Sequence, residues 1–392
     1  MSVGVGITLA PNRDFLDRVA PIVEGLVDYV EITPELSWGH DGVSDFFADV
    51  QQRSGLPFVA HGVGLSLGTP GPPDPAHLDR IARDHERFDF RWYSEHLGFW
   101  RAGERSVALA LPLPHTREAV AVVAGNLAAM AQVVPHVAFE NWAGFFAADT
   151  AADDPGFFRA IADESGASML LDLHNVQTHC HNTGTDPDAY VDAIDCSRVV
   201  EIHIAGGDWS NPVWTPSGRV FRLDGHDGPV TDWQWTTLAR VLPRCGSLQG
   251  VTLERLPHTL EAAHVPGFVA EFERLRSLVA ETRPGPAVTP MAPSCREEGE
   301  DLMAWERAVL DSLDGTPRVD LDPDGLRLTG RIVQKLRFQR LCTDPELARW
   351  FESDPQAFVE AFRAYHRAVP PRFVWAADEV AAFRRRLGDR LA

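Results

Sequence analysis

The sequence predicts an α/β fold, a (β/α)8 TIM barrel followed by a smaller, mostly helical C-terminal domain. Three observations support this prediction. Short apolar runs rich in β-branched residues recur between residues 3 and 256, helical patterns separate them, and a mostly helical pattern follows a Pro-rich stretch. Alternating strands and helices indicate a parallel sheet, and about eight such units in about 250 residues match the size of a TIM barrel. A doubly wound open sheet is the alternative.

Each expected strand is a short apolar run bounded by polar or turn-forming residues. The eight runs are residues 3–10, 28–35, 57–64, 91–99, 136–142, 168–176, 198–207 and 250–256. Between them, the apolar spacing of residues 116–134 and 154–165 predicts helices. These elements assign residues 1–282 to the barrel domain.

A linker and a helical region complete the chain. Residues 283–295 combine Pro with small residues, as linkers often do. Residues 301–313 have helical apolar spacing, and the segments TDPELARWF and SDPQAFVEAFRAYHRAV each place Asp before Pro. Asp is a favourable N-cap and Pro is favourable in the first helical turn. We therefore assign residues 296–392 to a mostly helical C-terminal domain.

Composition and charge restrict the partners. The formal net charge of −20 argues against nucleic acid or an anionic membrane, since phosphate binding normally needs a basic surface. Five Cys residues without framework spacing fit a reducing compartment. The N-terminal segment resembles a first strand rather than a signal peptide, and no apolar run has the length of a membrane span. We expect a soluble, cytoplasmic protein.

The ends of the last six expected strands each carry a residue that can bind a metal. These residues are His61, His96, Glu140, Asp172, His203 and Glu254, and the loop LDGHD adds Asp224 and His226. In a TIM barrel the C-terminal strand ends form the active site. Carboxylates clustered there would repel one another, so bound cations are the natural compensation. Eight ligands exceed the needs of one ion, which favours two or three ions, with Glu140 and Glu254 as candidate bridges.

Two short segments supply further candidates. In MLLDLHNVQTHCHN, Asp172 ends its strand and Asn175 is a candidate oxygen ligand, while residues 179–181 are expected in a solvated loop. His174 shares the face of Asp172 and is a candidate catalytic residue, either a ligand or a residue behind the ligands. Glu31 and Glu35, in EITPE, are candidates for positioning the substrate. A solvated or salt-bridged acid is an equally good interpretation of those two.

Taken in order, several motifs resemble those of one family, the multinuclear non-haem iron-dependent oxidases that modify ribosomally made peptides. This family includes the methanobactin-biosynthesis oxidase. The motifs are EITPE, HGVGLSLG, SEHLGF, ENWAG, LLDLHNV, EIHIAGG, LDGHD and LER. The resemblance implies a TIM barrel with two or three iron ions in mixed Fe(II)/Fe(III) states and O2 as co-substrate. It also implies oxidation of a peptide side chain, often a Cys. By motif, it carries the ligand role onto His61, His96, Glu140, Asp172, Asn175, His203, Asp224, His226 and Glu254.

The chain departs from the family pattern at two positions. The family more often has Asn where this chain has His174, and ENWAG replaces a commoner continuation after Glu-Asn. Both departures bear on the substrate more than on the metals.

The family also implies a precursor peptide recognised through a leader segment. Family oxidases often work with a separate partner that binds this leader, and the region from Arg296 is similar in character to such a partner fused into one chain. An ordinary helical appendage that stabilises the barrel or dimerises is the alternative.

Other functions compete with the oxidase. A multi-zinc phosphodiesterase of the apurinic endonuclease type has a comparable His, Asp and Glu site, but its polyanionic substrate conflicts with the charge of −20. A sugar isomerase of the xylose isomerase type uses more carboxylates and fewer His. A non-catalytic peptide-binding barrel should show gaps in the ligand set, and none is evident.

Overall fold

The structure, a computed structural model, describes residues 3–38, 40–283, 285, 288–313, 320–372 and 375–388. The chain forms two compact units. The barrel unit contains Met1–Gly98, Pro112–Ser210 and Val220–Gly299, and the helical unit contains Phe99–Leu111, Asn211–Arg219 and Glu300–Ala392. Residues 284, 286 and 287 of the expected linker, and residues 314–319, 373–374 and 389–392 of the expected helical domain, lie outside the described residues.

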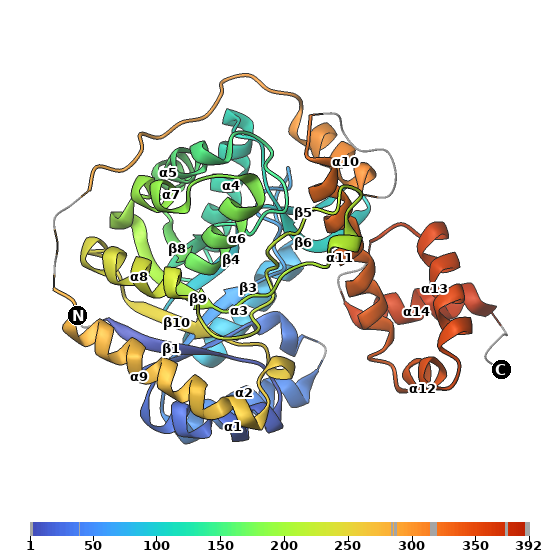
Figure 1. Cartoon of the computed structure of the whole chain (residues 1–392), viewed down its shortest axis with the longest axis horizontal. Coiled ribbons are helices and arrows are strands. Elements are labelled where there is room, and N and C mark those ends of the chain that lie inside the picture. The colour runs from blue at the N-terminus through green and yellow to red at the C-terminus, as the bar shows by residue number, and fades with distance from the viewer. Residues whose placement is uncertain are drawn as a thin grey trace. The chain divides into compact units, whose positions relative to one another are not determined.

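Eight parallel strands close into a barrel, which confirms the predicted fold class (Figure 1). The strands are β1 (Gly4–Leu9), β2 (Tyr29–Ile32), β3 (Phe58–Gly62), β4 (Tyr93–His96), β7 (Val137–Glu140), β8 (Ser168–Asp172), β9 (Val199–Ala205) and β10 (Gly250–Glu254). β1 pairs in parallel with both β2 and β10, so the sheet has no open edge. A doubly wound open sheet is therefore excluded.

Helices surround these strands, as Figure 1 shows. They are α1 (Arg13–Gly25), α2 (Asp41–Ser54), α3 (Pro75–Phe88), α4 (Arg117–Met130), α5 (Asp154–Ser165), α6 (Leu173–Thr183), α7 (Pro187–Ala193), α8 (Asp232–Val241) and α9 (Val265–Glu281). Side chains of Asn12, Thr116 and Thr231 cap α1, α4 and α8 by accepting backbone N–H groups. Such caps satisfy donors that the first helical turn leaves free.

The junction of β8 and α6 differs from the sequence prediction. The strand ends at Asp172 rather than continuing to residue 176, and α6 begins at the next residue. His179, Cys180 and His181 therefore lie in a helix and not in a loop, and the first two are buried. The physical reason is the Asp172 carboxylate, which caps α6 by accepting the Asn175 N–H at 2.9 Å.

Below the barrel mouth the interior contains a hydrogen-bonded carboxylate. Glu201 accepts hydrogen bonds from the Tyr29 hydroxyl (3.1 Å), the Trp92 indole N–H (2.6 Å) and the Thr252 hydroxyl (2.7 Å). The absence of a side chain at Gly6 makes room for Tyr29, because a Cβ there would lie 2.3 Å from its ring. All three donors are buried, so this carboxylate is satisfied within the barrel.

Between α9 and residue 302, the residues that the structure describes form neither a helix nor a named strand. The Met291 N–H donates to the Ala193 carbonyl at 2.9 Å, and the Ser294 N–H donates to the Gly156 carbonyl at 3.0 Å. This stretch therefore packs along the barrel unit. Within the described residues, the structure contains no helix long and apolar enough to cross a membrane.

In its described residues, the helical unit combines an antiparallel hairpin with five α-helices. The hairpin is β5 (Phe99–Ala102) and β6 (Arg105–Leu111), and the helices are α10 (Leu302–Ser312), α11 (Pro323–Leu341), α12 (Pro345–Ser353), α13 (Pro355–Ala368) and α14 (Ala376–Leu387). Asp322, Asp344 and Asp354 cap the three helices that begin with Pro. Leu341, Phe358 and Phe383 belong to the apolar core of the unit.

Candidate metal centre

His203 lies at the centre of the cluster at the C-terminal end of the barrel. Its Nδ1 is 3.1 Å from Glu254 Oε2 and 3.7 Å from Glu140 Oε1. Its Nε2 is 3.0 Å from Glu31 Oε2 and 3.6 Å from Glu201 Oε1. The imidazole is fully buried, so carboxylates surround both of its nitrogens away from solvent.

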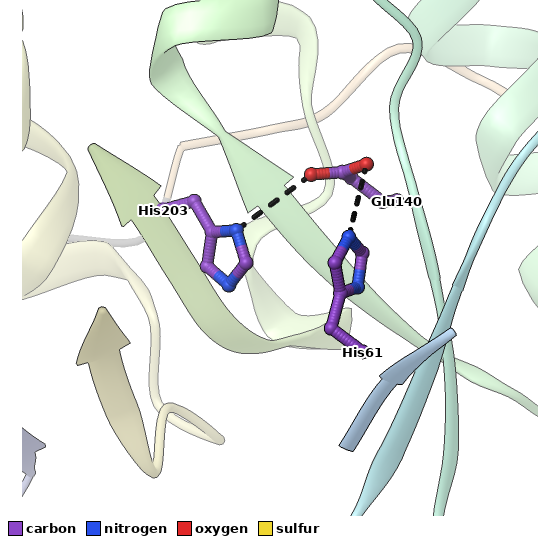
Figure 2. Close-up of side chains that lie close together, drawn as sticks. All are labelled: His61, Glu140 and His203. Carbon is purple, nitrogen blue, oxygen red and sulfur yellow. Dashed lines mark ion pairs between the residues drawn. The ribbon is translucent and has the colours of Figure 1, made fainter. Parts of the chain in front are cut away.

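Glu140 brings two further imidazoles into the cluster. Its Oε2 is 3.6 Å from His61 Nε2 and 3.4 Å from His96 Nε2. Figure 2 shows His61 and His203 pointing toward the two oxygens of the same carboxylate. The parallel pairing of β4 and β7 sets His96 opposite Glu140, which explains why these strand ends meet.

Hydrogen bonds behind the rings orient His61 and His96. His96 Nδ1 lies 2.9 Å from the Gly62 carbonyl, which can only accept, so the neutral ring carries its proton there. His61 Nδ1 lies 2.8 Å from the Ser94 hydroxyl, which itself donates to the Ala60 carbonyl. Both rings therefore present an unprotonated Nε2 toward Glu140, the tautomer that binds a metal.

A second part of the cluster forms around Glu254. His226 Nε2 lies 3.0 Å from Glu254 Oε2, and His226 Nδ1 lies 3.3 Å from Asp224 Oδ1. His226 has a φ of +46°, a conformation that residues other than Gly rarely adopt. Such strain is found at functional sites where the surroundings enforce it.

Asp172 and Asn175 place further oxygens beside this group. Asp172 Oδ1 caps α6, whereas Asp172 Oδ2 and Asn175 Oδ1 are buried without a hydrogen-bond partner in the described part of the chain. Asn141 holds the ends of β7 and β8 together, since its side chain donates to the Asp172 carbonyl and accepts the Asp172 N–H. Buried polar atoms are rarely left unsatisfied, so these oxygens fit the ligand atoms of a cation.

The electrostatics of the cluster also favour cations. Burial and the neighbouring Asp172 raise the pKa of Glu140 well above its usual range, and burial raises the pKa of Glu31 to about 7. Burial opposes protonation of His203 and His226, but nearby carboxylates outweigh it. Glu31 and Glu254 raise the pKa of His203 well above its usual range, and Glu254 and Asp224 raise the pKa of His226 to about 10. Cations that displaced protons from these groups would compensate the same carboxylate charge.

His174 reaches the cluster through Asp224. Its Nε2 lies 3.3 Å from Asp224 Oδ1, and its Nδ1 accepts a hydrogen bond from Arg222 at 3.1 Å. Because a guanidinium can only donate, the neutral ring carries its proton on Nε2, facing Asp224. A Cβ at Gly207 would lie 2.3 Å from Cε1 of His174, so the glycine makes room for this ring.

Glu31 and Glu35 have different surroundings. Glu31 contacts His203 and also accepts a hydrogen bond from the Thr8 hydroxyl at 2.7 Å. Glu35 accepts the backbone N–H groups of Val63 (3.0 Å) and Gly64 (3.2 Å) and so holds the loop after β3. The structure therefore brings Glu31 into the cluster and gives Glu35 contacts with the loop backbone.

Three residue groups in the described part of the chain have the proximity that metal binding requires. They are His61, Glu140 and His203; Glu31, His203 and Glu254; and Asp172, His226 and Glu254. The groups share His203 and Glu254, so they form one continuous cluster. Imidazole and carboxylate donors suit divalent first-row metals such as iron and zinc.

Sequence reasoning did not assign roles to Glu201 and Arg222. Glu201 precedes His203 by two positions, so the sequence indicates that both lie on the same face of the strand. The sequence does not indicate that Glu201 lies deeper in the barrel than the mouth. Arg222 lies in the segment before LDGHD, where the sequence shows neither strand nor helix periodicity. Its contact with His174 depends on the tertiary fold alone.

The fold and the cluster together define a class of protein: a TIM barrel with a shared histidine and carboxylate centre at its C-terminal mouth. A family profile described as RiPP precursor modification enzyme MbnB/TglH/ChrH matches residues 2–280, and the chain belongs to this family. RiPPs are ribosomally synthesised and post-translationally modified peptides. The family resemblance predicted from the motifs is confirmed.

Individual relatives cover most of the barrel unit. A UPF0276 protein of Caulobacter vibrioides is 33% identical over 247 residues, which is 62% of this chain and 84% of the relative. A UPF0276 protein of Pseudomonas aeruginosa is 31% identical over 278 residues, 70% of this chain and 92% of the relative. Among solved structures, D-psicose 3-epimerase from Clostridium cellulolyticum H10 aligns with a TM-score of 0.42 and 13% identity, covering 71% of this chain and 96% of that chain.

Proposed function

We propose that the chain is an iron-dependent, O2-using oxidase that modifies a side chain, often a Cys, of a ribosomally synthesised precursor peptide. One observation carries the proposal: a continuous buried cluster of imidazoles and carboxylates at the barrel mouth of a chain that belongs to a RiPP modification family. Side chains alone cannot activate O2, whereas iron in such a donor set supplies the one-electron chemistry that the reaction needs.

The proposed ligands divide between two or three iron ions that share carboxylates. They are His61, His96, Glu140, Asp172, Asn175, His203, Asp224, His226 and Glu254. The orphaned oxygens of Asp172 and Asn175 support this assignment, as does the unprotonated Nε2 of His96. Glu140 and Glu254 each contact more than one imidazole, which supports their role as bridges.

Other side chains orient the ligands. Glu31 contacts His203 Nε2, so it can accept that proton while Nδ1 faces the metal, an arrangement common behind metal-bound histidines. His174, held by Arg222, would fix the orientation of Asp224. Glu35 would act indirectly, by accepting hydrogen bonds from the backbone of the loop after β3. Burial of Glu140 and His203 limits the access of water to these two side chains.

The helical unit is proposed to bind the precursor peptide. Its largest stretch, Glu300–Ala392, lies beyond the part of the chain that the family profile matches, so we separate this role from the barrel chemistry. A unit with its own apolar core, including Leu347 and Phe362, can present a binding surface while the barrel presents the metal centre.

Metal analysis of protein purified without oxygen tests the proposal. We expect two or three iron ions per chain by mass spectrometry, and their loss in His203→Ala and in Glu254→Ala. His136→Ala is the matched control, because His136 is exposed and precedes β7 at the end of the strand opposite Glu140. Zinc with phosphodiester hydrolysis would favour the phosphodiesterase, and a lack of stoichiometric metal would refute a metal centre.

A further inference from the structure

A groove with an apolar floor and a basic rim lies in the helical unit. Its volume is about 360 Å³, within the range of pockets that take ligands. The floor is formed by Trp214, Leu328, Ile332, Phe338, Val359 and Phe362. Arg331, Lys335 and Arg363 line the rim. These residues define what we call the basic groove.

Helical spacing explains why one face of α11 builds half of this groove. Leu328, Arg331, Ile332 and Lys335 are three or four residues apart, so they follow one face of the helix. Alternation along that face places apolar side chains beside cationic ones. One turn of α13, with Val359, Phe362 and Arg363 in its lining, forms a second side.

Trp214 completes the floor from a segment that is fixed in place. It ends the short 3₁₀ helix Pro212–Trp214, and the following residues are tied to the start of α11. The Ser217 N–H donates to Asp324 at 3.4 Å, and Arg219 donates to Asp322 at 2.5 Å. The groove is therefore preformed, which lowers the entropic cost of binding a partner.

The rim cations are not used to hold the fold. Arg331, Lys335 and Arg363 are exposed, and they form no ion pair with any residue that the structure describes. Other arginines of this unit are paired: Arg337 lies 2.9 Å from Glu379, and Arg384 lies 2.8 Å from Asp344. Unpaired cations around an apolar floor fit a ligand that is both acidic and amphipathic.

The charge of the chain is distributed unevenly, and the helical region is much less acidic than the rest of the chain. Residues 300–392 contain 15 Arg or Lys and 16 Asp or Glu, a net charge of −1 in a chain of net charge −20. An acidic peptide is therefore repelled by the rest of the chain and least repelled by this region. Lys335 is also the only lysine of the 392 residues, which makes it a unique chemical probe of the groove.

We propose that the basic groove binds an acidic amphipathic segment of the precursor peptide as a helix. Apolar side chains at positions i, i+3, i+4 and i+7 would enter the floor, and Asp or Glu beside them would meet Arg331, Lys335 and Arg363. The identity of the ligand as a precursor rests on the proposed function. The site and its preference for acidic amphipathic peptides rest on the groove itself.

Acylation of Lys335 by an amine-reactive ester tests the site in the full-length, metal-free chain. The probe is a synthetic helical peptide of about 18 residues, with Leu at the spacing above and Glu elsewhere. Mass spectrometry follows acylation of Lys335, with the N-terminal amine as internal reference. At saturating peptide we expect Lys335 acylation to slow by about fivefold or more, whereas a peptide with Lys in place of Glu leaves it unchanged.

Charge reversal supplies the second measurement. Peptide affinity by fluorescence anisotropy should fall by about tenfold or more in Arg331→Glu and in Arg363→Glu. Arg349→Glu, an exposed position of α12 outside the groove, should bind normally. All three positions are exposed, so the substitutions leave the core of the unit intact.

Several results would overturn the site. The first is that the basic peptide or duplex DNA protects Lys335 from acylation as well as the acidic peptide does. The second is that the acidic peptide gives no protection. The third is that protection grows with protein concentration alone, which would indicate a second copy of the chain in the groove. The assay needs neither metal nor turnover. Acidic peptide bound in the groove of a chain that fails to take up iron when iron is supplied would therefore refute the oxidase and support the site, and iron uptake without peptide binding would do the reverse.

Discussion

At the scale of single residues, His203 couples the ligand cluster to the carboxylate behind it. Glu31 Oε2 lies 3.0 Å from His203 Nε2, on the side of the ring away from Glu254 and Glu140. We expect Glu31→Gln to lower metal affinity by about 10- to 100-fold, because carboxylates behind metal-bound histidines fix the ring and raise its basicity. Competition with a chelator of known affinity measures the effect.

Glu35→Gln is the matched control for that prediction. Glu35 is equally buried and also precedes α2, but its partners are the N–H groups of Val63 and Gly64. Metal affinity should change by less than about twofold in this variant, since a glutamine oxygen still accepts those N–H groups. Equal losses of metal affinity in the two variants would mean that the contact of Glu31 with His203 does not cause the effect.

Because Glu35 is buried, we also predict that the free energy of unfolding depends on pH. Burial raises its pKa from 4.5 to about 7, so the native carboxyl keeps its proton over a range in which the unfolded one has lost it. The native state binds more protons between about pH 4.5 and 7, and its free energy of unfolding therefore falls as the pH rises through this range. The contribution of this group is on the order of 3 kcal/mol.

Urea unfolding at several pH values measures this contribution. Glu35→Gln resembles the protonated form at every pH, so its unfolding free energy should decline less between pH 5 and pH 8 than that of the unchanged chain. Glu86→Gln, an exposed position of α3, should keep the full decline. A Glu35→Gln profile parallel to that of the unchanged chain would show that Glu35 does not cause the dependence.

The candidate ligands could be predicted from sequence because strand ends and side-chain alternation are local properties. Glu140, Asp172 and Glu254 are the last residues of their strands, where the pattern placed them. Arg222 could not be predicted, since no periodicity marks its segment and its partner His174 lies 48 residues away. Contacts of that kind follow from the closed barrel rather than from any local pattern.

At the scale of elements, the Asp172 side chain has two roles at the junction of β8 and α6. Asp172 Oδ1 caps the helix, and Oδ2 is free for a cation. Asp172→Asn keeps the capping acceptor and should leave the metal-free chain at least as stable, because the cost of burying a charge is removed. Asp172→Ala should lose about 1 kcal/mol. Both variants should lose metal.

Unfolding free energies and metal content, measured on the same preparations, separate the two roles. If Asp172→Asn retained full metal content, the amide would be a sufficient ligand and the carboxylate charge unnecessary. If Asp172→Ala were as stable as Asp172→Asn, the hydrogen bond to the Asn175 N–H would contribute nothing to α6.

Sequence patterns predicted some elements closely and missed others for a physical reason. Helix α5 has the predicted bounds, because an Asp-Pro start and a following Gly166 mark both of its ends. Helix α6 was missed because His, Asn and Thr fill positions that are buried in the fold, so no hydrophobic period appears. The hairpin β5–β6 was missed because its first strand begins three residues after β4 ends.

At the scale of the whole molecule, the helical unit is assembled from three separate stretches of sequence. Phe99–Leu111 and Asn211–Arg219 join Glu300–Ala392, although both stretches fall within the residues assigned to the barrel by sequence. No local pattern can reveal such an assignment, since it depends on contacts such as the one between Arg219 and Asp322, 103 residues apart. The later Asp-Pro helices α12 and α13, by contrast, were predicted from their starts.

All of the candidate ligands belong to the barrel unit, so metal loading should stabilise the barrel against unfolding. An ion that binds only the native state at 100 times its dissociation constant adds about 2.7 kcal/mol for each independent site. Ferrous iron added without oxygen should therefore raise the unfolding midpoint of the metal-free chain, as followed by calorimetry. His203→Ala should abolish the rise and His136→Ala should keep it, because only the first removes the imidazole that Glu140 and Glu254 share. An equal rise in His203→Ala would place the stabilising iron outside this cluster and would contradict the proposed centre.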